Sequence, residues 1–196
     1  LVAALGAGSR RRVGLGRAGE RHFLFHVGIG FDAAVVDQVE RRGGLKRWLG
    51  HGLFLGAAVG TWVAGYDRSR PHFAVRVGDE APIDGALALC LETDPYTFLG
   101  PRPLTVEPGT GFDTGLAVLV LRDLNLATLL RAGGAALTGG SRLPELPGVE
   151  LRRDLERVLV DGYRPFPHQV DGDYLGLVES LEITHRPDCL DLVVPA

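Results

Sequence analysis

Methionine is absent from this chain of 196 residues, and lysine occurs only once, at Lys46. Cysteine occurs twice, at Cys90 and Cys189, which is too few for the disulfide framework of a small secreted domain. We therefore expect reduced structural thiols in a cytoplasmic setting, although one disulfide between the two remains open. The missing methionine and the start at Leu1 indicate a piece of a longer product.

Several sequence patterns that bind ligands are also absent. The run Gly28–Ala33 reads GIGFDA, which matches neither of the glycine-rich spacings GxGxxG and GxxxxGK[ST] that cradle phosphates. The six histidines are scattered along the chain with no HxH spacing, and no serine lies in a GxSxG elbow. These absences argue against a zinc site and against a serine hydrolase triad. We expect this chain alone to bind no nucleotide and to phosphorylate nothing.

The composition is that of one globular domain over residues 1–196, with 45% hydrophobic and 23% charged residues. Many short apolar runs separated by glycine and proline predict a mainly β (α+β) fold, an antiparallel sandwich with two or three helices. The expected strands are 22–27, 73–77, 86–92, 116–121, 157–160, 178–184 and 189–194. The expected helices are 33–42, 45 to about 66, and 126–132. The run 116–121 is apolar at nearly every position, so we place it at the centre of the sheet.

The charge is uneven along the chain. The first fifty residues contain nine Lys and Arg against four acids, whereas the remainder contains twelve against twenty, which gives the net charge of −3. A solvated basic face explains this excess, and attraction to anionic lipid headgroups is the functional alternative. Nucleic acid is disfavoured, because aromatic residues are not interleaved with the basic ones.

The segment from Trp48 to Tyr66 is almost free of charge and nearly long enough to cross a bilayer. Five glycines and one histidine lower its hydrophobicity, and a membrane span needs about 20 mostly apolar residues. We interpret the segment as a buried or site-lining helix, with a membrane span as the alternative.

The richest segment for chemistry is His168–Leu175, which reads HQVDGDYL. Pro165 and Pro167 before it lack a backbone donor, so we expect an extended segment near a sheet edge. In an extended chain Asp171 and Asp173 share a face, where two carboxylates can shift each other's pKa and serve as an acid and a base. The other interpretation is a β-turn, because Asp-Gly is a common hairpin dipeptide.

Asp32 also has two interpretations. The preceding Gly-Ile-Gly turn can present its carboxylate to a cleft. It can equally cap the helix that begins at Ala33, where an aspartate satisfies free backbone N–H groups.

Three segments in order resemble the C-terminal domain of the bacterial diacylglycerol kinase and lipid kinase family. GIGFDA at Gly28–Ala33 is similar to the family's early GxGFDA motif, and QVDGD at Gln169–Asp173 to its late VDGE or VDGD motif. Between them, TDPYTFLG at Thr93–Gly100 followed by FDTGL at Phe112–Leu116 resembles the middle of the domain in the actinobacterial branch. The family's nucleotide-binding half, with a GGDGT loop, would lie upstream.

The resemblance implies an ATP-dependent lipid kinase acting with Mg²⁺ on diacylglycerol or a similar lipid hydroxyl. It implies that Asp171 is the general base and Asp173 its acidic companion. It also implies that the acceptor lipid is bound by a group of residues in the first third of the chain: Gly28, Gly30, Asp32, Trp48, Phe54 and Trp62. Ordinary core packing is an equal alternative for the aromatic residues. Asp113 occupies the position of a structural magnesium ligand, but the second aspartate of that pattern is Thr114 here.

The implied partners are a lipid substrate, MgATP held by the missing domain, and the inner face of the plasma membrane as a peripheral surface. A homodimer is possible. Within the same superfamily the alternative is an NAD kinase relative, although its NAD-binding motif is not evident. From a different class, the alternative is a non-catalytic lipid-binding or regulatory module.

Overall fold

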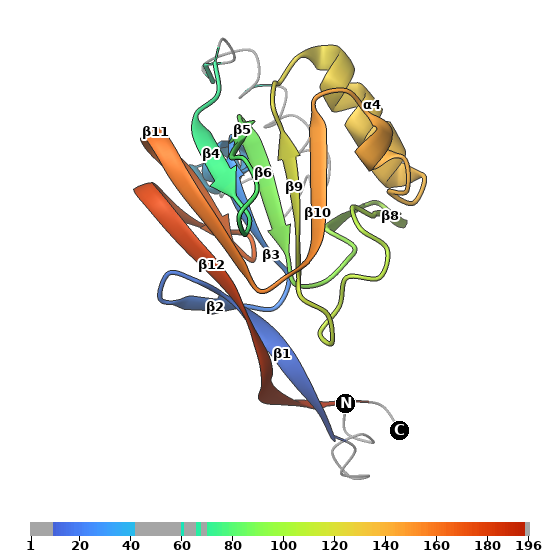
Figure 1. Cartoon of the computed structure of the whole chain (residues 1–196). Coiled ribbons are helices and arrows are strands. Elements are labelled where there is room, and N and C mark those ends of the chain that lie inside the picture. The colour runs from blue at the N-terminus through green and yellow to red at the C-terminus, as the bar shows by residue number, and fades with distance from the viewer. Residues whose placement is uncertain (1–9, 42–59, 61–65, 68–69, 195–196) are drawn as a thin grey trace.

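The computed structural model describes residues 10–41, 60, 66–67 and 70–194. Antiparallel strands dominate this part of the chain (Figure 1). In chain order the elements are β1 (Arg10–Ala18), β2 (Arg21–Phe23), β3 (His26–Gly30), α2 (Phe31–Arg41), β4 (Phe73–Arg76), β5 (Ile83–Gly85), β6 (Leu87–Leu91), β7 (Thr97–Leu99), β8 (Arg102–Leu104), β9 (Leu116–Leu121), α4 (Leu126–Leu137), the 3-10 helix η1 (Leu143–Glu145), β10 (Val149–Leu155), β11 (Arg157–Val170) and β12 (Asp173–Val193).

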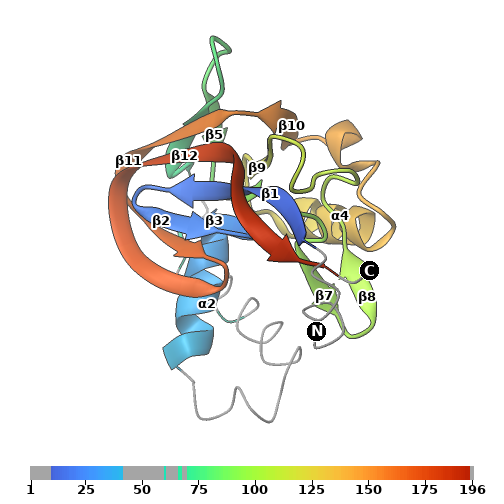
Figure 2. The same ribbon diagram turned by 90° about the horizontal axis from the view of Figure 1, so that it is seen from below.

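Ten of the strands form one sheet. Eight of them follow one another in the order β10-β9-β6-β3-β11-β12-β1-β2. Strands β4 and β5 extend it from β11, while β7 and β8 form a separate hairpin. The long strands β11 and β12 curve around β1, β2 and β3 when the molecule is seen from below (Figure 2). The sheet therefore folds over itself, and its concave side encloses a core.

Side chains of the central strands alternate between two cores. On β6, Ala88 and Cys90 face a core that is lined by strands, whereas Leu87, Leu89 and Leu91 face a second core beneath the helices. Successive residues of a strand point to opposite faces, so a strand covered on both sides must be apolar throughout. This is the reason that β9, paired with β6 and β10, is buried at all six positions.

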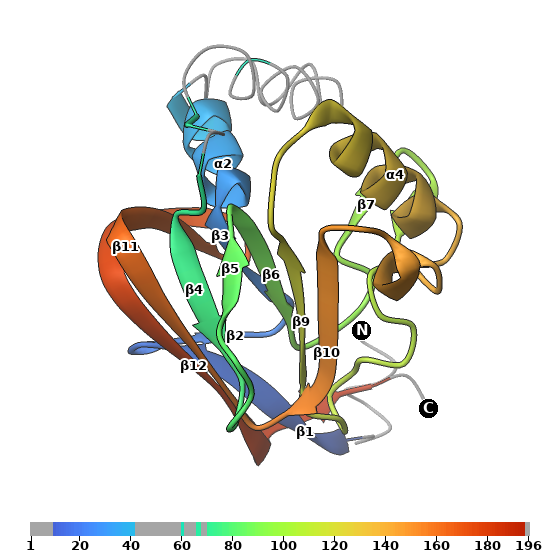
Figure 3. The ribbon, with the colours of Figure 1, turned by 45° about the horizontal axis from the view of Figure 1, so that its top comes forward.

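Helices α2 and α4 lie at one end of the sheet (Figure 3). Phe31, Val35 and Val39 of α2 enter the second core together with Ala132 and Ala135 of α4. The spacing of these residues by three and four positions puts them on one face of each helix. Asn125 caps α4, because its side-chain oxygen accepts a hydrogen bond of 2.8 Å from the Thr128 N–H.

The predicted antiparallel sandwich with helices is confirmed, and so is the central position of 116–121. Several boundaries were wrong. The expected strand 22–27 is divided between β2 and β3, and the two expected C-terminal strands are parts of the single strand β12. Strands β1 and β10 and the β7–β8 hairpin were not expected, because their polar positions hide the apolar pattern. Both cysteines are free, Cys90 in the core and Cys189 at the surface.

The expected helix from Leu45 to about Tyr66 lies almost wholly outside the described residues. Within the described part of the chain, no helix is long and apolar enough to cross a membrane.

Candidate functional site

Asp171 and Gly172 form the two-residue turn between β11 and β12. Their φ angles are 50° and 87°, so both lie in the left-handed region that a type I′ hairpin turn requires. Asp and Gly tolerate this conformation better than most residues. The hairpin interpretation of this segment is therefore confirmed, and the fully extended one is wrong.

The expectation of a nearby sheet edge holds for one side of β11 only. On that side β4 pairs with residues 159–162 and β3 with residues 168–170. Among the described strands none pairs with residues 163–167 there, which is where Pro165 and Pro167 lie. On its other side β11 is paired with β12. The two prolines, which lack an N–H donor, therefore lie between the stretch of β11 that pairs with β4 and the stretch that pairs with β3.

The carboxylate of Asp171 binds the turn between β2 and β3. Oδ2 accepts a hydrogen bond of 2.9 Å from the Leu24 N–H, and Oδ1 accepts bonds of 3.0 and 2.9 Å from the N–H groups of Phe25 and His26. The Asp171 N–H donates in return to the His26 carbonyl at 2.9 Å. A carboxylate has about four lone-pair positions. Oδ2 of this exposed aspartate therefore keeps one position for another donor.

The same turn is held from its other side by the end of β6. The Glu92 N–H donates to the Phe25 carbonyl at 2.9 Å, and the Thr93 hydroxyl donates to the Leu24 carbonyl at 3.1 Å. Both the donors and the acceptors of the turn are thus engaged, which fixes the N–H groups that hold Asp171.

A buried polar chain joins the GIGFDA segment to the QVDGD segment. The Gln169 side chain is fully buried, donates from Nε2 to Asp32 Oδ2 at 3.0 Å, and accepts at Oε1 from the Gly172 N–H at 2.8 Å. Asp32 Oδ1 accepts a further hydrogen bond of 2.5 Å from the Tyr96 hydroxyl. Burial, reinforced by the Asp32 charge, raises the pKa of Tyr96 well above its usual value, so the phenol stays protonated and donates. Asp32 thus serves this network rather than capping α2.

The two glycines of GIGFDA are required by close packing. A Cβ on Gly28 would lie 1.7 Å from Asp32 Oδ2 and 2.4 Å from Gln169 Nε2. Gly30 has a φ of 72°, and a Cβ there would lie 2.5 Å from the Ala86 carbonyl oxygen. Both glycines and Asp32 are buried, and their direct contact with a substrate stays a prediction.

His26 lies close enough to Asp32 and Asp171 for both carboxylates to influence its ring. Its ring makes an edge contact with Tyr96 at 4.6 Å between centroids, and its Nδ1 is buried without a hydrogen-bond partner among the described residues. Burial lowers the pKa of His26, against the opposing influence of Asp32 and Asp171. The ring is therefore neutral at pH 7.

Asp173 differs from Asp171 in its surroundings. Its carboxylate pairs with Arg21 on β2, and its side chain is 64% exposed. The structure therefore directs the two aspartates to different partners. The role of Asp173 as the companion of Asp171 stays a prediction.

Asp113, the predicted magnesium ligand, has an arginine as its partner, and its metal role stays a prediction. Its carboxylate pairs with Arg11, and the Thr114 hydroxyl donates to the Gly111 carbonyl at 2.9 Å. Among the described residues, no group of three or more His, Cys, Asp or Glu side chains is placed to hold a metal ion. An arginine thus neutralises the carboxylate on which the predicted metal site depended, and Thr114 lacks the second carboxylate.

Trp48, Phe54 and Trp62 lie outside the described residues, so their predicted lipid contacts stay predictions. Tyr66, at the end of that segment, is described. It stacks on His72 at 4.5 Å, meets Phe31 edge-on at 5.5 Å and donates to the Ala86 carbonyl at 3.1 Å. These contacts place Tyr66 against the first residue of α2.

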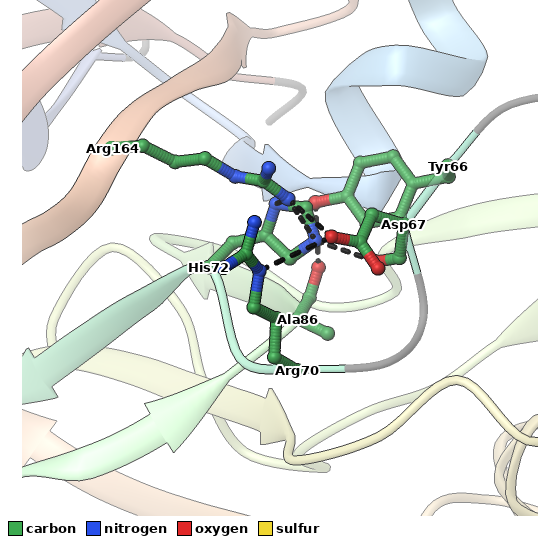
Figure 4. A network of polar contacts seen from close by, with 6 residues as sticks. All are labelled: Tyr66, Asp67, Arg70, His72, Ala86 and Arg164. Atoms are coloured by element: carbon green, nitrogen blue, oxygen red, sulfur yellow. Dashed lines mark hydrogen bonds and ion pairs between the residues drawn. The ribbon is translucent and has the colours of Figure 1, made fainter.

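The next residue, Asp67, forms ion pairs with two arginines (Figure 4). The Arg164 guanidinium lies 3.0 Å from Asp67 Oδ2, and the Arg70 Nε lies 3.3 Å from the same oxygen. The His72 ring forms a 2.6 Å hydrogen bond with the Asp67 carbonyl. Together these bonds attach residues 66–67 and 70–72 to β11.

Gln169, Tyr96 and His26 were missed as members of the site. The first two lie within the recognised segments QVDGD and TDPYTFLG, so the motifs carried the signal. No sequence pattern singled out His26, because only the fold brings it beside Tyr96.

No protein-family model matches the sequence, and no curated protein matches it. Solved structures do share the fold. One is a "putative diacylglycerol kinase" from Bacillus anthracis str. Sterne, with a TM-score of 0.68 at 13% identity over 98% of this chain. A crystal structure described as that of a diacylglycerol kinase from the same strain gives a TM-score of 0.60 at 12% identity, and a further "putative diacylglycerol kinase" from that strain gives 0.62 at 15% identity, each over 98% of this chain. This chain spans 57% to 59% of those proteins.

Proposed function

We propose that this chain is the acceptor-lipid-binding and base-supplying part of an ATP-dependent kinase that phosphorylates diacylglycerol or a similar lipid hydroxyl. The observation that carries the proposal is the junction of GIGFDA with QVDGD through Asp32, Gln169 and the Gly172 N–H. The fold shared with structures of diacylglycerol kinases supports it.

In the proposed reaction Asp171 takes the proton of the lipid hydroxyl. Its Oδ2 has a free lone-pair position, while the N–H groups of Leu24, Phe25 and His26 hold the carboxylate in place. An unactivated alcohol is a poor nucleophile, and a positioned proton acceptor contributes roughly 10²–10⁴-fold to the rate. Asp32 and Gln169 act as positioning residues, because they fix the turn through Gly172.

MgATP would supply the γ-phosphoryl group for in-line transfer, and we propose that it is bound outside this chain. A lipid acceptor places the reaction at a bilayer, and we propose the cytoplasmic face of the plasma membrane as its location.

The test is a phosphoryl-transfer assay on the polypeptide produced together with any upstream coding sequence. Radiolabelled ATP and dispersed diacylglycerol should give labelled phosphatidic acid, and Asp171→Asn should abolish most of the label. Calorimetric titration of the present chain with MgATP should give no heat of binding. Binding in the micromolar range would require a nucleotide site within this chain and would contradict the proposed division of roles.

A non-catalytic lipid-binding module is the second candidate. It is favoured by one observation: three of the four lone-pair positions of Asp171 are used to hold the β2–β3 turn. Under this alternative the longer polypeptide would bind lipid vesicles and would transfer no phosphate to any lipid alcohol.

A further inference from the structure

Helix α4 carries two of its four leucines on the outside, whereas Leu129 packs against the second core. Its buried positions are Thr128, Ala132, Ala135 and Ala136, all small. Leu126 and Leu130 are instead 52% and 67% exposed. They are four residues apart and so lie one above the other on the helix surface. A helix that only covers a core has the opposite arrangement, with its large apolar side chains turned inward.

Helix α4 and the adjoining β7–β8 hairpin carry only positive charge, and Asp123 and Glu145 are the nearest acidic residues that flank the helix in sequence. Residues 124–144, which include α4, contain no Asp or Glu, and neither do residues 95–106, which include the β7–β8 hairpin. The hairpin is joined to the helix by the hydrogen bond of 3.0 Å from the Thr105 N–H to the Ala136 carbonyl. The exposed residues Arg102, Arg131 and Arg142 have no ion-pair partner within the described part of the chain.

Three of the five arginines in residues 10–21 are different. Arg11, Arg12 and Arg21 are paired with Asp113, Asp191 and Asp173 respectively. Their charge is compensated within the molecule, so their attraction for an external anion is reduced. The uncompensated cations next to exposed leucines are those around α4.

We propose that the outer face of α4 docks on an anionic lipid bilayer, with Leu126 and Leu130 entering the interface and Arg131, Arg102 and Arg142 facing the headgroups. Apolar side chains flanked by arginines are the composition of helices that lie in a membrane interface. A second copy of the chain is a poorer partner, because a two-fold interface would bring the same arginines together. The inference rests on the proposed function to the extent that a membrane holds the acceptor lipid.

The experiment is co-sedimentation of this chain with vesicles of phosphatidylcholine alone and of phosphatidylcholine with phosphatidylglycerol. The wild-type chain should bind only the anionic vesicles, and the binding should weaken with added salt. The double variant Leu126→Ser/Leu130→Ser should bind roughly tenfold more weakly, since less apolar surface enters the interface. Arg131→Gln should bind more weakly and with a shallower salt dependence.

Leu177→Ser is the matched control, because Leu177 on β12 is 62% exposed and lies outside the α4 face. It should bind vesicles as the wild type does, and circular dichroism should show all variants folded. Equal vesicle binding by the double variant and the wild type would contradict the proposed docking surface. Failure of the wild type to bind anionic vesicles would contradict it as well. Disruption of a dimer by the double variant, without loss of vesicle binding, would instead assign the face to a second copy. None of these results bears on phosphoryl transfer by the longer polypeptide, so failure of the surface and failure of the kinase proposal are separable.

Discussion

The Asp171 turn and the outer face of α4 differ in whether their polar and apolar side chains have partners within the molecule. Around the turn, Asp171, Asp32 and Gln169 have hydrogen-bond partners from three segments that are distant in sequence. On α4, two leucines and the neighbouring arginines have no partner among the described residues. The first region is organised by the fold itself, and the second is available to something outside it. Substitutions should therefore affect folding and chemistry at the turn, but only association at the helix.

The largest effect is expected from Asp171→Asn. In the longer polypeptide we expect kcat for lipid phosphorylation to fall by roughly 10²–10⁴-fold, because the proton acceptor is lost. Asparagine also replaces one acceptor oxygen by an NH₂ group that faces backbone N–H donors. Denaturant unfolding of the present chain should therefore show a loss of about 1 kcal/mol.

Asp173→Asn is the matched control for that change. Its pair with Arg21 is solvent exposed, so the stability should change by less than about 1 kcal/mol. A fall in kcat as large as that of Asp171→Asn would mean that the two carboxylates act as a unit. Unchanged turnover in Asp171→Asn would leave Asp171 with a structural role alone.

The same substitution at two glycines compares the regions directly. Gly28→Ala should destabilise the chain by about 3 kcal/mol, because the added methyl group overlaps Asp32 and Gln169. Gly134→Ala in α4 meets no atom within 4 Å and should stabilise by about 1 kcal/mol through helix propensity. Chemical denaturation of both variants measures the difference. Similar changes in unfolding free energy for the two variants would show that Asp32 and Gln169 move aside for the added methyl group at little cost.

The smallest expected effect is a pH dependence from His26. Its pKa in the folded state is below 6.5, so the unfolded chain binds the proton more readily. The resulting stability is present above pH 6.5 and is lost as the pH falls through the folded-state pKa. His72 and His168 shift in the same direction, so the wild type alone is not diagnostic.

His26→Phe keeps a ring against Tyr96 and removes the titrating group. Between about pH 7.5 and 5.5 the unfolding free energy of the wild type should fall more than that of the variant. Parallel curves for the two proteins would mean that His26 is protonated as easily in the folded chain as in the unfolded one.

The sequence predicted the elements whose pattern is local. Strand β9 was placed correctly because all its positions are apolar, and α2 because its apolar residues follow the helical period. Strand β1 was missed because it begins with three exposed arginines, and β10 because its middle positions are polar. Such strands are recognised by their partners in the sheet, which a local pattern does not contain.

The site divides in the same way. The sequence by itself determined that glycine and aspartate occur together in GIGFDA and QVDGD, and that Asp-Gly favours a hairpin turn, since turn conformation depends on the residues within it. Only the tertiary structure decided that Gln169 joins the two segments, that the Asp171 carboxylate binds the β2–β3 turn, and that Arg11 forms an ion pair with Asp113. It also decided that Leu126 and Leu130 of α4 face outward. Hydrogen bonds and burial depend on which segments meet in space, and that is settled by packing over the whole sheet.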